Sequence, residues 1–227
     1  MADDALFDAA DQKTFLTGRP WREFAKPKEL DRHGPATVIS MVNQKGGVGK
    51  TTSTINLGAC LAEQGRKVLL VDLDPQGALS AGLGVSYEED QVTVYDLLFD
   101  NTASIHAAIN TTNVSGLDVV PANIDLSAAE IQLVNEVGRE HTLARALRPV
   151  RGEYDYIFID CGPSLGLLTV NALAASQGVI IPMEGEYYSL RGLALLTDTV
   201  EKVRDRINFD LDIVGILVTM FDRRTTH

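Results

Sequence analysis

A chain of 227 residues can bury a full core as one large α/β domain, and its 45% hydrophobic and 22% charged residues are ordinary for a soluble globular protein. No apolar run approaches the roughly 20 residues of a membrane span, and the acidic N-terminus lacks the basic-then-apolar layout of a signal peptide. The net charge of −11 opposes avid nucleic-acid binding unless a local basic patch provides it. Two cysteines, Cys60 and Cys161, suggest no disulfide framework, so we expect cytoplasmic residence.

Residues 1–35 combine proline, glycine and mixed charge without a sustained period, which predicts a partly ordered extension. Trp21 and Phe24 in this extension would pack on the domain surface or on a partner. The expected strands that follow span residues 37–42, 67–74, 117–121, 154–160, 178–182 and 213–220. The expected helices span residues 52–64, 94–99, 104–109, 127–137, 142–148 and 165–175, and a last, long helix places on one face Leu193, Leu196, Val200, Val203 and Ile207.

Alternation of helices with near-continuous apolar strands indicates an α/β fold with a doubly wound, mostly parallel sheet covered on both faces. Right-handed crossovers then bring the C-terminal ends of the parallel strands to one edge of the sheet. The chain stops shortly after its last expected strand without a closing helix, which predicts a domain truncated at its C-terminus. We therefore expect one large domain at residues 36–227 with its C-terminal part missing.

The segment QKGGVGKTT, residues 44–52, joins the first expected strand to a helix that begins at about Gly49. A glycine-rich loop of this kind turns backbone N–H groups inward, and the helix dipole adds positive potential at the same place. Lys50 would reach the β- and γ-phosphates of a nucleotide, and the Thr51 hydroxyl would bind Mg²⁺. The strict pattern G-x-x-x-x-G-K-[ST] is not met, because Gln44 replaces the first glycine and Lys45 follows it. The alternative, a glycine-rich turn with incidental lysines, does not account for the strand before the loop and the helix after it. We therefore expect a P-loop NTPase with ATP and Mg²⁺ as cofactors. The expected phosphate cradle consists of Gly46, Gly47, Val48, Gly49, Lys50, Thr51 and Thr52.

Two further loops at strand ends carry carboxylates. Asp72 and Asp74 close the second expected strand, and Asp160 closes the fourth. Phosphoryl transfer to water needs a metal ion, a group that orients the water and added positive charge in the transition state. We expect Asp160 to hold the Mg²⁺ shell through water, Asp72 to lie near Mg²⁺ and Thr51, and Asp74 to orient the water. Each aspartate alone is weak evidence, because strand-capping aspartates are common; three beside a phosphate loop indicate an ATPase site.

These motifs together resemble a known family. QKGGVGKTT, then VLLVDLDPQG after one helix, then YIFIDCGPS, is similar to the ParA/Soj partition ATPases, relatives of MinD with a deviant Walker A motif. The resemblance covers residues 37 to the end. It implies that Lys45 is the signature lysine, which crosses a dimer interface to the partner's phosphates and acts as a catalytic cation. It also implies that Lys50 and Thr51 contact phosphate and Mg²⁺, that Asp74 serves hydrolysis and that Asp160 has the Walker B role.

The resemblance further implies a cycle in which ATP closes a homodimer, the dimer binds DNA nonspecifically at the nucleoid, and a ParB-type partner stimulates hydrolysis and release. The C-terminal segment is similar to one that carries a DNA-contacting arginine, best matched by Arg224 with Arg223 beside it; a solvated surface pair is the alternative. Gly162 stands where the family usually has a proline, which loosens the turn after Asp160.

Two other functions remain open at this point. One is a MinD-like ATPase that positions division components at membranes, although the sequence Asp-Pro-Gln-Gly after Leu73 favours the partition branch. The other is a nucleotide-gated scaffold that binds ATP and barely turns it over. Slow turnover without a partner is expected of the partition ATPase too.

Overall fold

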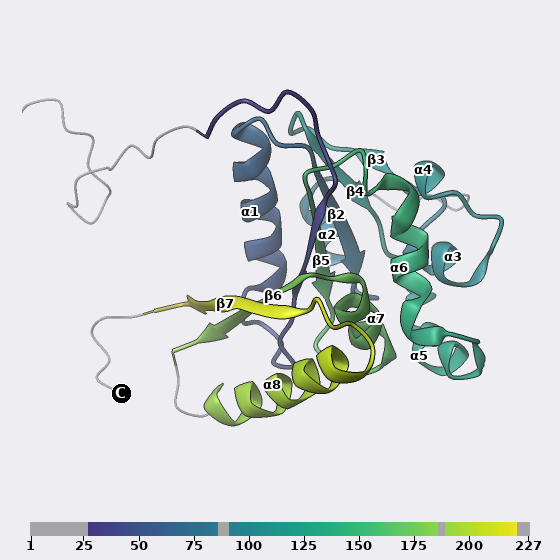
Figure 1. Ribbon diagram of the computed structural model, residues 1–227, viewed down its shortest axis with the longest axis vertical. Helices are drawn as coiled ribbons and strands as arrows, with labels where there is room; N and C mark the ends of the chain where they lie inside the picture. Colours follow the sequence, from purple (N-terminus) through teal and green to yellow (C-terminus); the bar gives the residue numbers. More distant parts are fainter. Residues whose placement is uncertain (1–26, 86–90, 186–188, 222–227) are drawn as a thin grey trace, which may run out of the picture.

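The computed structural model describes residues 27–85, 91–185 and 189–221, and the side chains of residues 189–191 are not described. Within these ranges a seven-stranded sheet runs through the molecule in the order β3-β4-β2-β5-β1-β6-β7 (Figure 1). Neighbouring strands are parallel except β3 and β4, which are antiparallel. The strands are β1 (Thr37–Met41), β2 (Val68–Leu73), β3 (Asn110–Thr111), β4 (Leu117–Val120), β5 (Tyr156–Cys161), β6 (Gly178–Glu184) and β7 (Asp212–Thr219).

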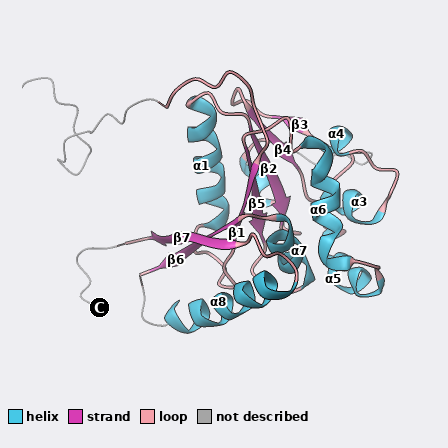
Figure 2. Ribbon diagram, in the orientation of Figure 1, coloured by secondary structure: helices cyan, strands magenta, loops and turns pink. Residues whose placement is uncertain are grey.

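Helices cover both faces of this sheet (Figure 2). The α-helices are α1 (Lys50–Glu63), α2 (Ala78–Gly82), α3 (Val94–Phe99), α4 (Ile105–Ala108), α5 (Leu126–Gln132), α6 (Thr142–Leu147), α7 (Leu167–Ala175) and α8 (Ser189–Arg206). Alternation along β2 shows the two faces: Val68 and Leu70 pack with α1 and α2 in one apolar cluster, whereas Leu69 and Val71 belong to the larger cluster with the other helices. The expected doubly wound, mostly parallel α/β fold is confirmed.

The connection from β1 to β2 passes to one side of β1, and the connection from β5 to β6 passes to the other. The strand order therefore reverses at β1, and a crevice opens outside the carboxyl ends of the strands at such a point. The loop after β1 lies at this place.

The long helix α8 buries the face that the sequence predicts. Leu196, Val200 and Val203 are almost completely buried, and Leu193 and Ile207 pack against the same core. The helix α1 also ends as expected: Gln64 is its C-cap, and Gly65 follows in the left-handed region with φ 77°.

The prediction of one helix over residues 127–137 is wrong. Helix α5 ends at Gln132, a 3₁₀ turn spans Leu133–Asn135, and Glu136 is extended. Val137 is 93% exposed, and Gly138 adopts a positive φ of 64°. No apolar surface is available to hold a further helical turn at Val137, and a left-handed glycine ends the helical path.

Helix α7 begins at Leu167, two residues later than expected. The carboxylate of Glu130, on α5, accepts hydrogen bonds from the backbone N–H groups of Leu167 at 2.8 Å and Leu168 at 3.4 Å. A side chain from a distant helix thus caps this N-terminus. Two shorter features, the helix α2 and the antiparallel strand β3, were not expected from the sequence.

The described part of the segment before β1 is attached to the N-terminal edge of the sheet. The His33 ring Nδ1 lies 2.7 Å from the Asp155 carboxylate, which also accepts the N–H of Gly34. Trp21 and Phe24 lie outside the described residues. Among the described helices, none combines the length and apolar character that crossing a bilayer requires.

Candidate nucleotide-binding site

The loop between β1 and α1 forms an open cradle in front of a helix N-terminus. Gly47 and Gly49 adopt positive φ values of 76° and 83°, which residues with a Cβ rarely adopt. A Cβ built on Gly46 or Gly47 would meet no atom within 4 Å, so the outer part of the loop borders open space. Val48, by contrast, is buried and anchors the loop. Helix α1 begins at Lys50, directly after this loop.

The ends of β6 and β7 hold the loop from one side. The Asn43 side chain accepts the N–H of Lys45 at 2.9 Å through Oδ1, and its Nδ2 donates to the carbonyl oxygen of Pro182 in β6 at 2.7 Å. The Thr219 hydroxyl, at the end of β7, donates to the carbonyl oxygen of Val48 at 2.8 Å. The conformation of the loop therefore depends on strands that are far away in the sequence.

The ammonium group of Lys50 lies inside the cradle. Lys50 is only 7% exposed, and its Nζ donates to the carbonyl oxygen of Lys45 at 3.2 Å across the loop. Burial lowers the pKa of Lys50, and the negative charges of Asp160 and Asp74 oppose this shift. A phosphate group in the cradle would add negative charge beside Lys50 and favour its charged form.

Thr51 and Asp160 meet at the first turn of α1. The Thr51 hydroxyl donates to Asp160 Oδ2 at 2.6 Å, and the Thr54 hydroxyl lies 3.4 Å from Asp160 Oδ1. Burial raises the pKa of Asp160 to about 7, with the hydrogen bond from Thr51 acting in the opposite direction. A hydroxyl and a carboxylate beside a phosphate cradle are oxygen ligands of the kind that Mg²⁺ takes. The donor set thus fits magnesium, with Thr51 and Asp160 as the residues that would hold it.

Asp72 is also buried, but the hydrogen bonds described for its carboxylate come from the segment that directly follows β2, including α2. It accepts the N–H and the hydroxyl of Ser80 at 2.9 Å and 2.7 Å, and the N–H of Asp74 at 3.3 Å. Burial raises the pKa of Asp72, and the Ser80 hydrogen bonds lower it. Asp72 and Asp160 are register partners on β2 and β5. The role of Asp72 near the metal stays a prediction, whereas its contact with Ser80 fixes the start of α2.

Asp74 is the first residue of the loop after β2, and its side chain lies near the turn that follows β5. Its Oδ1 accepts the N–H of Gln76 at 3.0 Å. A Cβ on Gly162 would lie 3.4 Å from Asp74 Cγ, at ordinary van der Waals distance. The turn after Asp160 and the Asp74 side chain therefore lie side by side.

Lys45 lies at the entrance of the loop and is bound to its own chain. Its Nζ pairs with Glu184 Oε2, at the end of β6, at 2.5 Å. The Lys45 side chain is 47% exposed, and that of Glu184 is 19% exposed. No local pattern in the sequence signals Glu184 or Thr219, because each contacts the loop through strand order rather than through spacing in the chain. Asn43 contacts Lys45 locally, but its bond to Pro182 also depends on strand order.

Arg223 and Arg224 lie outside the described residues. Cys161 is buried, and burial raises the pKa of its thiol, so it behaves as a small apolar side chain in the sheet.

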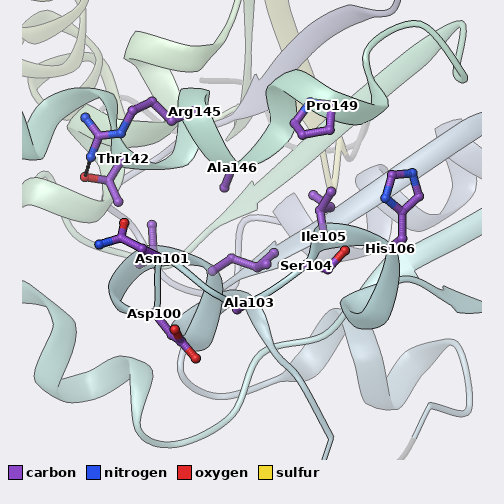
Figure 3. Close-up of a pocket in the computed structure, with 12 residues that line it drawn as sticks. Asp100, Asn101, Ala103, Ser104, Ile105, His106, Thr142, Arg145, Ala146 and Pro149 are labelled. Carbon is purple, nitrogen blue, oxygen red and sulfur yellow. Dashed lines mark hydrogen bonds between the residues drawn. The ribbon is translucent and has the colours of Figure 1, made fainter.

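A hollow of about 330 Å³ lies between the α3–α4 segment and α6 (Figure 3). Its lining, which includes Asp100, His106 and Arg145, shares no residue with the three strand-end loops.

Known proteins that are similar to this chain match it over the region that contains these motifs. A family model described as an AAA domain matches residues 36–213. An uncharacterized protein of Mycobacterium tuberculosis is 66% identical over 212 residues, which cover 93% of this chain and 67% of that protein. The sporulation initiation inhibitor protein Soj of Bacillus subtilis is 54% identical over 188 residues, covering 83% of this chain and 74% of Soj. This chain belongs to the ParA/Soj family of P-loop ATPases.

Solved structures agree with this assignment. A Mycobacterium smegmatis protein named cobyrinic acid a,c-diamide synthase, crystallised with an ATP analogue and magnesium, has a TM-score of 0.80 and 45% identity, and the match covers 85% of this chain and 78% of that one. A plasmid partition protein from Borrelia burgdorferi has a TM-score of 0.74 and 30% identity, over 85% and 82% of the two chains. ATP and Mg²⁺ are the cofactors of this P-loop family, as the phosphate loop predicts.

Proposed function

We propose that the protein is a partition ATPase in which ATP binding closes a homodimer and each Lys45 completes the site of the other protomer. The observation that carries this proposal is the pair of lysines in one loop. Lys50 lies buried inside the cradle, whereas Lys45 lies half-exposed at its entrance, 2.5 Å from Glu184. Two lysines so placed are suited to different phosphate contacts, one within the protomer and one across an interface.

In this mechanism Mg²⁺, when bound with ATP, neutralises charge that develops on the phosphates. Thr51 and Asp160 would hold the metal. Lys50 and the backbone N–H groups from Gly46 to Thr52 would bind the phosphates, and Asp74 would orient the attacking water. Lys45 of the second protomer would add positive charge in the transition state. The reaction is hydrolysis of ATP to ADP and phosphate, slow until a partner stimulates it.

The cellular role proposed for this ATPase is the segregation of chromosomal or plasmid DNA. The dimer would bind nonspecific DNA at the nucleoid in the cytoplasm, through a local basic segment that includes Arg224 and Arg223. A local patch is required because the net charge of −11 makes the overall field repulsive to phosphate. A ParB-type protein would stimulate hydrolysis and so release the dimer from DNA.

The first experiment compares Lys45→Ala with Lys50→Ala in the full-length protein. Lys45→Ala should keep ATP affinity within about threefold of the wild type and lose ATP-dependent dimerisation in light scattering. The reason is that the ammonium group of Lys45 is proposed to contact the phosphates bound by the other protomer. Lys50→Ala should lose ATP binding itself. Lys202→Ala is the matched control, because Lys202 is also exposed and ion-paired, to Asp198 on α8. Dimerisation of Lys45→Ala at the wild-type ATP concentration would refute the role of Lys45 across the interface.

A second experiment separates the alternative functions. ATPase activity that rises with DNA and a ParB-type protein supports the partition switch. Binding of ATP without stimulated turnover supports a nucleotide-gated scaffold, and ATP-dependent binding to vesicles supports a MinD-like role. ATP-dependent amidation would indicate the activity after which the Mycobacterium smegmatis neighbour is named.

A further inference from the structure

A single peptide unit of the phosphate loop is held by a side chain from the far edge of the sheet. The carbonyl oxygen of Val48 accepts a hydrogen bond of 2.8 Å from the hydroxyl of Thr219. Thr219 is the last residue of β7 and lies 171 positions later in the chain. Its register partner on β6 is Glu184, which pairs with Lys45. The two strand ends therefore contact the loop side by side.

The geometry of a trans peptide relates this contact to the phosphate side of the loop. In a planar trans peptide the C=O and the following N–H point in opposite directions. Because the Val48 carbonyl points toward Thr219, the N–H of Gly49 points away from β7. This N–H belongs to the last residue before α1, where backbone donors and the helix dipole together attract phosphate.

Without the hydrogen bond from Thr219, the Val48–Gly49 peptide would be free to rotate. Gly49 has a φ of 83°, and glycine adopts positive and negative φ with similar ease. Rotation of the Val48–Gly49 peptide would exchange the positions of the carbonyl oxygen and the N–H. It would then present a partial negative charge to the phosphates in place of a donor.

We propose that Thr219 is a positioning residue for nucleotide binding. Its hydroxyl fixes the Val48–Gly49 peptide in the orientation that directs the Gly49 N–H to the phosphates. The Thr219 side chain lies close to this peptide, since its Cγ2 is 3.5 Å from the position that a Cβ on Gly49 would occupy. Strand β7 thus takes part in ATP binding although it contributes no residue to the phosphate loop. This inference rests on the nucleotide binding of the proposed function and is independent of dimerisation, DNA binding and the role of Lys45.

The test compares three variants of the full-length protein. Thr219→Val keeps the shape of the side chain and removes the donor, whereas Thr219→Ser keeps the donor. Thr197→Val is the matched control, because the Thr197 hydroxyl donates at 2.9 Å to a carbonyl oxygen within α8 and lies apart from the loop. The probes are Mg·ATP and Mg·ADP, measured by titration calorimetry, and the steady-state kcat and KM for ATP.

Thr219→Val should raise the Kd for both nucleotides and the KM for ATP by about 2- to 10-fold, the effect of losing one neutral hydrogen bond. Its kcat should stay unchanged, because the lost interaction acts on binding alone. Thr219→Ser should restore wild-type affinity within about twofold, and Thr197→Val should not change it. If Thr219→Val does not fold, Thr219→Ser and Thr219→Ala differ by one hydroxyl and give the same comparison.

Wild-type affinity in Thr219→Val would overturn the inference, and so would an equal loss in the serine and valine variants, because that loss could not come from the hydrogen bond. Failure of the wild-type protein to bind ATP would instead contradict the proposed function. The two failures are therefore distinguishable within one set of titrations.

Discussion

The buried carboxyl group of Asp160 should make the stability of the metal-free protein depend on pH. Asp160 is fully buried, and its pKa is raised from 3.8 to about 7 by desolvation. Below pH 3.8 both the folded and the unfolded chain hold the proton, so burial of the group costs nothing. Between 3.8 and about 7 the folded state holds a proton that the unfolded state releases, so stability falls as the pH rises. Above about pH 7 the carboxylate is charged in both states, and the loss of folding stability caused by its burial has reached its full value.

The variant Asp160→Asn removes this charge and keeps an oxygen that can accept the Thr51 hydrogen bond. A difference of about 3 pKa units corresponds to about 4 kcal/mol at pH 8, since one unit corresponds to 1.36 kcal/mol. Asp160→Asn should therefore be more stable than the wild type at pH 8 by up to about 4 kcal/mol. About 2.5 kcal/mol of this advantage should disappear between pH 8 and pH 5.

The assay is urea unfolding of both proteins at pH 5, 6.5 and 8 in the presence of a magnesium chelator. Asp210→Asn is the control, because the Asp210 side chain is exposed. The reasoning is refuted if Asp160→Asn is no more stable than the wild type at pH 8, or if its advantage does not change between pH 5 and pH 8. In a separate series without the chelator, Mg·ATP should stabilise the wild type and not Asp160→Asn, because the variant lacks the carboxylate proposed to hold the metal.

Three further predictions concern the proposed cycle. Asp74→Ala should bind ATP and remain dimeric while hydrolysis is lost in a phosphate-release assay; wild-type turnover would assign the orientation of water to another group. Glu184→Gln should lower the ATP concentration for half-maximal dimerisation by about two- to fivefold, because a neutral amide releases the Lys45 ammonium from a partly exposed ion pair. Light scattering tests this, and the same shift in a Lys45→Ala background would contradict the reason given. Arg224→Glu should reduce retention on nonspecific DNA at low salt, and unchanged retention would argue against a DNA contact by Arg224.

The sequence predicted the parts of the fold that local patterns determine. The apolar runs of β1, β2 and β5 are nearly continuous because both faces of the sheet are covered there, and the burial of these strands confirms this. The edge strand β7 is equally apolar but largely exposed. The apolar stripe of α8 and the left-handed Gly65 after α1 were also predictable from spacing and residue type. Prediction failed at residues 127–137, where an apolar pattern continued past Gln132 but no apolar surface covers Val137.

Within the site, the sequence by itself determined the phosphate loop and the three aspartates at two strand ends, because a short motif with fixed spacing encodes a local conformation. The tertiary structure alone decided how these groups are paired. The order and register of the strands bring Asp160 to Thr51, leave Asp72 bound to Ser80, and place Glu184 and Thr219 against the loop from β6 and β7. These contacts join residues more than 100 positions apart, except the one between Asp72 on β2 and Ser80 on α2. No local spacing records them, since they arise when separate strands pair in one sheet.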